Sequence, residues 1–108
     1  MNKVIKDNKP DLIWIGSNKY KINYSPKLLA DDGDELYGQI VYSENIINIS
    51  TNYKIHFQRE GLLHEILHGI NYWYNSNRLS EKDIIAMAHG LFDLIRQNPG
   101  VLNWIKED

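Results

Sequence analysis

Four short stretches rich in apolar residues occupy the first half of the chain. They cover residues 12–15, 19–24, 37–43 and 46–50. A short turn-forming segment joins the first stretch to the second, and another joins the third to the fourth. Apolar and polar residues alternate most clearly in the second and fourth stretches, which is typical of half-buried strands. We therefore predict two strand pairs. Within the third stretch, Gly38 is expected to mark a bulge or a close approach to the backbone.

The second half of the chain changes to a helical period. Residues 56–74 carry apolar side chains three or four positions apart, which predicts a helix with one buried stripe, formed by Leu63, Ile66, Leu67, Ile70 and Tyr74. A second helix is predicted to begin at Ser80, where Asp83 completes a capping-box pattern, and to end at residues 98–100. Its buried stripe is expected at Ile84, Ala88, Leu91 and Ile95.

These patterns predict an α+β fold for a single domain spanning residues 1–108. A small, mostly antiparallel sheet of about three to four strands is expected to pack against two helices. The polar residues 1–11 are expected to be a loose N-terminal tail. Residues 101–105 are expected to form a short turn that packs Trp104 back onto the domain. A chain of 108 residues suits one hydrophobic core.

Composition and charge narrow the function classes. The net charge is −2 and there is no basic block, which argues against direct binding to nucleic acid. No segment is apolar over the length of a membrane span, and residues 1–8 lack the apolar core of a signal peptide. The chain has no Cys, so disulfides are excluded and any metal ion must be held by His and carboxylates. These features suit a cytoplasmic protein.

The first predicted helix contains an H-E-x-x-H motif at residues 64–68. Positions i and i+4 lie on one helix face, so His64 and His68 can both reach one ion at ~2.0–2.1 Å. Glu65 lies beside His64, where its carboxylate can act on water next to the ion without binding the ion. Two solvated surface histidines are the simpler alternative, but both histidines border the apolar stripe and need partners there. We therefore predict a site for one Zn²⁺ with Glu65 as general base.

A catalytic zinc site needs a third protein ligand and one open position. Glu81 is a candidate, because position 81 continues the buried stripe of the second helix. On geometry alone it competes with a simpler role, in which the helix dipole stabilises an acid at the helix N-terminus. His89, on a flank of the same helix, is the rival ligand. Asp83 is explained more simply by the cap, and His56 lies two turns before the motif.

Residues from about Tyr37 to Pro99 resemble the short, phage- and prophage-associated members of the ImmA/IrrE-like minimal zinc metallopeptidases. The matching stretches are residues 37–42, 46–49, 62–68, 79–81, 84–92 and 98–99. This family places its third metal ligand at the Glu that opens the second helix, which favours Glu81. One departure is Ile85, which stands where larger relatives often carry a polar residue.

The resemblance implies a minimal zincin-like fold and a cytoplasmic protein encoded by a bacterium or phage. It also implies a zinc-dependent peptidase that cleaves a protein or peptide substrate, and relatives often act on helix-turn-helix repressors. Glu65 would move a proton while water attacks a peptide carbonyl. Tyr72 and His89 are candidate hydrogen-bond donors to the metal ligands or to the oxyanion.

Three other interpretations stay open at this point. The first is a catalytically inactive metal-binding or protein-interaction module of the same fold. The second is a structural zinc site with a fourth ligand, such as His89 or Asp83. The third is a domain without metal. Two histidines and one carboxylate also suit Mn²⁺ or Fe²⁺, so the ligand set does not identify the native metal.

Overall fold

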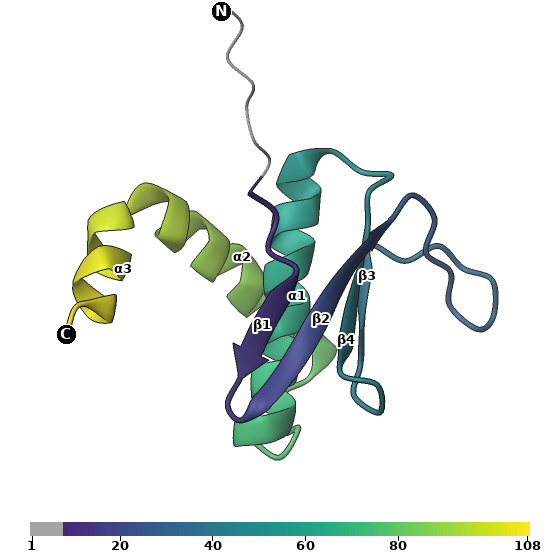
Figure 1. Ribbon diagram of the computed structural model, residues 1–108, viewed down its shortest axis with the longest axis horizontal. Helices are drawn as coiled ribbons and strands as arrows, with labels where there is room; N and C mark the ends of the chain where they lie inside the picture. Colours follow the sequence, from purple (N-terminus) through teal and green to yellow (C-terminus); the bar gives the residue numbers. More distant parts are fainter. Residues whose placement is uncertain (1–7) are drawn as a thin grey trace, which may run out of the picture.

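The computed structural model describes residues 8–108 as a four-stranded sheet and three helices (Figure 1). The strands are β1 (Leu12–Ile15), β2 (Asn18–Ser25), β3 (Gly38–Val41) and β4 (Ile46–Ser50), and the helices are α1 (Ile55–Tyr74), α2 (Glu81–Gln97) and α3 (Pro99–Lys106). The predicted α+β class is confirmed, with one helix more than expected.

The sheet has the strand order β1-β2-β4-β3. β1 pairs with β2 and β3 pairs with β4, both antiparallel, so the two predicted strand pairs are confirmed. Gly16 (φ 62°) and Asn45 (φ 54°) provide the left-handed backbone that these tight turns require. The two pairs meet where β2 runs parallel to β4, which makes the sheet mixed although mostly antiparallel. β1 and β3 are left as the edge strands.

The main core lies between one face of the sheet and α1. Alternate strand residues point into it and are buried, as the period of two requires: Ile15, Tyr20, Ile22, Ile47 and Ile49. Leu62 and Ile66 of α1 pack against this cluster. The indole Nε1–H of Trp73 donates a hydrogen bond of 2.8 Å to the Tyr20 hydroxyl, which ties the end of α1 to β2.

α1 is covered on two sides, which the single predicted stripe does not capture. One side lies on the sheet, where a Cβ added to Gly69 would meet Ile15 Cδ1 at 2.6 Å, so glycine allows the close approach. The other side packs on α2, where Leu67 joins the second core cluster. The predicted stripe is wrong at Ile70 and Tyr74, which are 41% and 68% exposed. Neither residue belongs to the two core clusters, although the Tyr74 ring touches the turn between β1 and β2.

α2 begins as the sequence predicts. The Ser80 hydroxyl accepts a hydrogen bond from the Asp83 amide, and the Asp83 carboxylate accepts one from the Ser80 amide, each at 3.2 Å. The helix ends at Gln97, and Ile84 and Ala88 of its predicted stripe are buried against α1. The capping box therefore fixes the direction in which Glu81, the first helical residue, leaves the turn.

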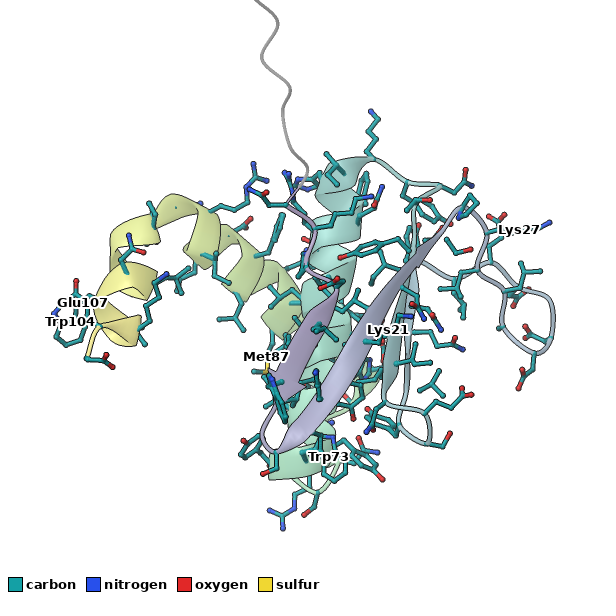
Figure 2. All side chains as sticks on the ribbon, viewed as in Figure 1. Lys21, Lys27, Trp73, Met87, Trp104 and Glu107 are labelled. Atoms are coloured by element: carbon teal, nitrogen blue, oxygen red, sulfur yellow. The ribbon has the colours of Figure 1, made fainter. Side chains whose placement is uncertain are left out.

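The C-terminal segment forms α3 and does not pack back onto the domain. Pro99 has no backbone N–H and cannot continue α2, but its fixed φ suits the first position of a new helix. Among the described elements, α3 contacts α2 alone, and the two helices form a hook beside the sheet (Figure 1). Trp104 is 76% exposed at the far end of this hook (Figure 2), so the prediction for Trp104 is wrong.

The predicted tail is only partly within the described residues, because residues 1–7 lie outside them. Residues 8–11 have no regular secondary structure, but two of their carbonyls bind β2. The Pro10 carbonyl accepts a hydrogen bond from the Tyr24 hydroxyl at 2.6 Å, and the Asp11 carbonyl accepts one from the Ile22 amide at 2.8 Å. Within residues 8–108, none of the helices combines the length and apolar character that crossing a bilayer requires.

The register of β4 can be tested with two adjacent isoleucines. Ile47→Ala should lower the free energy of unfolding by ~2–5 kcal/mol, because it opens a cavity in the core. Ile46→Ala should cost clearly less, because Ile46 points to the other face and is only partly buried. Urea denaturation of both variants makes the comparison. Equal losses would contradict the register.

Candidate metal site

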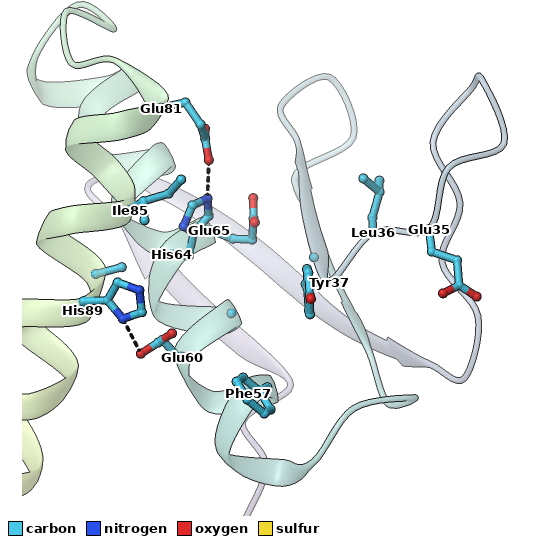
Figure 3. A pocket seen from close by; sticks show the side chains of 13 residues that line it. Glu35, Leu36, Tyr37, Phe57, Glu60, His64, Glu65, Glu81, Ile85 and His89 are labelled. Atoms are coloured by element: carbon cyan, nitrogen blue, oxygen red, sulfur yellow. Dashed lines mark hydrogen bonds and ion pairs between the residues drawn. The ribbon is translucent and has the colours of Figure 1, made fainter.

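The side chains of His64, His68 and Glu81 converge at one end of the α1–α2 interface. His64 Nε2 lies 2.8 Å from Glu81 Oε1, His68 Nε2 lies 2.7 Å from Glu81 Oε2, and the two Nε2 atoms lie 3.1 Å apart. Figure 3 shows Glu81 pointing from α2 toward His64 on α1. Within residues 8–108, no further His, Cys, Asp or Glu joins this potential metal-binding group.

The convergence follows from an antiparallel pairing of α1 and α2. Four polar contacts join them, and residues that come later in α2 meet residues that come earlier in α1: Glu81 with His64 and with His68, His89 with Glu60, and Arg96 with His56. The two histidines lie one turn apart on α1, as the motif spacing predicts. The short connection before Ser80 then returns the chain so that the first residue of α2 faces them.

The donor atoms suit a divalent cation. Burial lowers the pKa of His64, which outweighs the opposing influence of the Glu81 carboxylate, so the neutral imidazole needed for metal binding is favoured. Ligand atoms of a tetrahedral zinc ion with bonds of ~2.0–2.1 Å lie about 3.3 Å apart. Glu81 presents Oε1 to His64 at 2.8 Å and Oε2 to His68 at 2.7 Å, and the two Nε2 atoms lie 3.1 Å apart, so the donor atoms would have to move slightly apart to hold an ion. The Glu81 side chain, 59% exposed, has room for this movement.

Glu65 is buried next to the triad, with only 7% of its surface exposed. Burial, followed by the negative charge of Glu81, raises the pKa of Glu65 to about 8. A cation held by the triad would favour the ionised carboxylate and lower this pKa again. Glu65 is not itself one of the three residues that could hold an ion.

Gly38, at the start of β3, is where the sheet comes close to Glu65. A Cβ added to Gly38 would lie 3.2 Å from Glu65 Cγ, 3.2 Å from Ile49 Cδ1 and 3.3 Å from the Asn48 carbonyl oxygen. The close backbone approach expected at this glycine is therefore confirmed. The absence of a side chain at position 38 lets Glu65 fit between the helix and the strand.

A cleft of about 470 Å³ opens beside the triad, between the two helices and the segment that leads into β3 (Figure 3). Apolar side chains contribute much of its lining: Leu36, Tyr37, Phe57 and Ile85. Glu35 and Glu60 add two carboxylates, and within residues 8–108 no Lys or Arg lines the cleft. The cleft therefore offers apolar walls and negative charge next to the triad.

Of the other candidate residues, His89 lines the cleft, whereas Tyr72 and Asp83 do not. His89 lines the cleft, with its Nδ1 3.0 Å from Glu60 Oε1. Tyr72 stacks on Tyr42 with ring centroids 4.0 Å apart and is not among the residues that line the cleft. Asp83 serves the cap of α2. Sequence reasoning did not single out Glu60, although its place one turn before His64 on the same helix face was the available signal.

Tyr42 supports the backbone of the motif from the sheet side. Its hydroxyl donates a hydrogen bond of 3.1 Å to the His68 carbonyl oxygen. Burial raises the pKa of Tyr42 to about 12, with smaller contributions from neighbouring Tyr20, Glu65 and Tyr72, so the hydroxyl keeps its proton at neutral pH. This contact joins the β3–β4 turn to α1 at the helical turn that carries the second histidine.

Comparison with protein families, curated proteins and solved structures gives no match for this chain. The structure itself shows a group of His64, His68 and Glu81 that is compatible with a metal site of the HExxH kind.

The close approach at Gly38 can be tested by adding one methyl group. Gly38→Ala should lower the free energy of unfolding by ~1–3 kcal/mol, because the Cβ overpacks the space between Glu65 and β4. Gly90→Ala is the matched control: nothing lies within 4 Å of its Cβ, and alanine in a helix should stabilise by ~0.5–1 kcal/mol. Chemical denaturation measures both. A stabilising effect of Gly38→Ala would contradict the packing described for Glu65.

Proposed function

We propose that this protein is a zinc-dependent peptidase of the HExxH type, related to the ImmA/IrrE-like minimal metallopeptidases that its sequence resembles. One observation carries the proposal: His64, His68 and Glu81 converge beside a buried Glu65 at the end of an open cleft. Three protein ligands with an open side are typical of catalytic zinc, whereas structural zinc has four protein ligands.

Each residue has a defined role in this proposal. His64, His68 and Glu81 hold the ion, which supplies a Lewis acid for water and for the scissile carbonyl. Glu65 takes a proton from the attacking water and passes it to the nitrogen of the leaving amine as the C–N bond breaks. His89, hydrogen-bonded to Glu60 at the cleft wall, donates to the oxyanion.

The substrate in this proposal is an extended segment of a protein. β3 is an edge strand whose first residue, Gly38, lines the cleft, so a peptide lying there has a strand edge to pair with. The apolar side chains of the walls would contact its side chains. By resemblance to the family, a helix-turn-helix repressor is the proposed class of protein substrate.

Two glutamate variants separate the catalytic role from metal binding. Glu65→Gln should keep about one zinc per chain and lower peptide cleavage by roughly 10²–10⁴-fold, because the general base is lost while the ligands stay. Glu81→Gln should lower zinc affinity and cleavage together. Glu44→Gln, in an exposed turn, is the control and should change neither. The readouts are zinc content by elemental analysis and cleavage of denatured casein and of a candidate repressor by mass spectrometry.

Zinc binding with no cleavage that depends on Glu65 would favour the alternative of a catalytically inactive metal-binding or protein-interaction module. Failure of the wild-type protein to bind zinc under replete conditions would contradict the proposal altogether.

A further inference from the structure

Asn71 is a buried polar residue in α1 whose hydrogen bonds reach beyond its own helix. It lies three positions after His68 and is 2% exposed. Its Nδ2 donates to Asn77 Oδ1 at 3.2 Å and to the Leu79 carbonyl at 3.3 Å, and its Oδ1 accepts from the Leu79 amide at 3.1 Å and from Asn75 Nδ2 at 3.0 Å. The side-chain amide has two donor hydrogens and two acceptor lone pairs, and all four are used.

The partners of Asn71 all belong to the connection between α1 and α2. The Asn71 carbonyl also accepts hydrogen bonds from the amides of Asn75 and Asn77, at 3.1 and 2.9 Å. Asn77 is in the left-handed region at φ 58°, so the chain reverses direction within this connection. One side chain therefore binds Leu79 through both its N–H and its C=O, and fixes the backbone two residues before Glu81.

The side chain of Glu81 has few contacts of its own, so its place depends on the backbone that carries it. Its side chain is 59% exposed, and the contacts described for it are those with His64 and His68. Ser80, between Leu79 and Glu81, is held by the capping box. We propose that Asn71 is a positioning residue, which sets Glu81 opposite the two histidines by fixing Leu79. The inference rests on the metal site of the proposed function, and adds a residue that touches neither the ion nor the substrate.

Termination of α1 is a simpler role for Asn71, but it does not account for the contacts. α1 continues to Tyr74, three residues beyond Asn71. Ending the helix requires bonds to the residues that follow immediately, whereas two of the four side-chain bonds go to Leu79, eight positions along the chain. A residue that only ended the helix would leave zinc affinity unaffected when replaced.

The test compares zinc affinity in two asparagine variants, measured by competition with a chromophoric chelator. Asn71→Ala should weaken zinc binding by roughly 10–100-fold, the range typical of residues that orient a metal ligand. Asn98→Ala is the matched control. The Asn98 side chain donates one hydrogen bond of 3.0 Å to the Leu94 carbonyl, at the other end of α2. It should disturb the helix end and leave zinc affinity unchanged.

A double-mutant cycle then shows whether Asn71 acts through Glu81. In a Glu81→Gln background, Asn71→Ala should add little further loss of zinc affinity, although its effect on stability should persist. The absorption of the Co²⁺-substituted protein is a second readout: Asn71→Ala and Glu81→Gln should change the ligand-field bands in the same way. If Asn71→Ala fails to fold, the isosteric Asn71→Asp, which loses both donor bonds, replaces it in the cycle.

Unchanged zinc affinity in a folded Asn71 variant would overturn the inference, as would an equal loss with and without Glu81. When the wild-type protein binds zinc but no cleavage depends on Glu65, the peptidase proposal fails, while the zinc affinities of the Asn71 variants still decide the inference. The two failures are therefore distinguishable.

Discussion

The carboxyl groups of Glu65 and Glu81 and the imidazoles of His64 and His68 lie together beside a cleft, and within residues 8–108 no Lys or Arg lines that cleft. This electrostatic constraint governs the site. Glu65 is buried and lies in the field of Glu81, so ionising it is costly, and its pKa is raised to about 8. A divalent cation between the histidines and Glu81 would offset both negative charges. The donor atoms and the buried negative charge therefore both favour a divalent cation.

The fold positions the site by packing α1 closely between the sheet and α2. Gly69 allows the helix to lie close to β1, and Gly38 allows β3 to lie close to Glu65. Leu67 packs toward α2 on the other side. The motif turn is thus held by the sheet and by the second helix at once. Glu81 comes from the first turn of α2 and its side chain is 59% exposed, which is why the α1–α2 connection and its hydrogen bonds to Asn71 matter.

Local patterns predicted the parts of the structure that depend on nearby residues. The two strand pairs follow from alternation and turns, and the capping box at Ser80 from its two side chains. The spacing of the motif put His64 and His68 on one face, and the stripe of α2 pointed Glu81 inward. Each of these signals acts over a few residues, where sequence spacing determines geometry.

Other features depend on contacts that sequence spacing does not encode. The parallel pairing of β2 with β4 joins segments about twenty residues apart, and nothing local specifies it. α1 is covered on two sides, so the prediction of one stripe failed at Ile70 and Tyr74. Trp104 was expected to pack back onto the domain, but Pro99 starts a helix that extends along a different direction. Glu60 acquires its partner His89 only once α2 is in place, and Asn71 acquires its partners once the connection reverses the chain.

X-ray absorption at the zinc edge of the loaded wild-type protein tests the central claim most directly, because it reports the ligands of the ion itself. The account predicts about four nitrogen or oxygen neighbours at ~2.0–2.1 Å, with outer-shell scattering from two imidazoles that falls to one in His68→Ala. Zinc that shows no imidazole scattering, or scattering unchanged by His68→Ala, would contradict it.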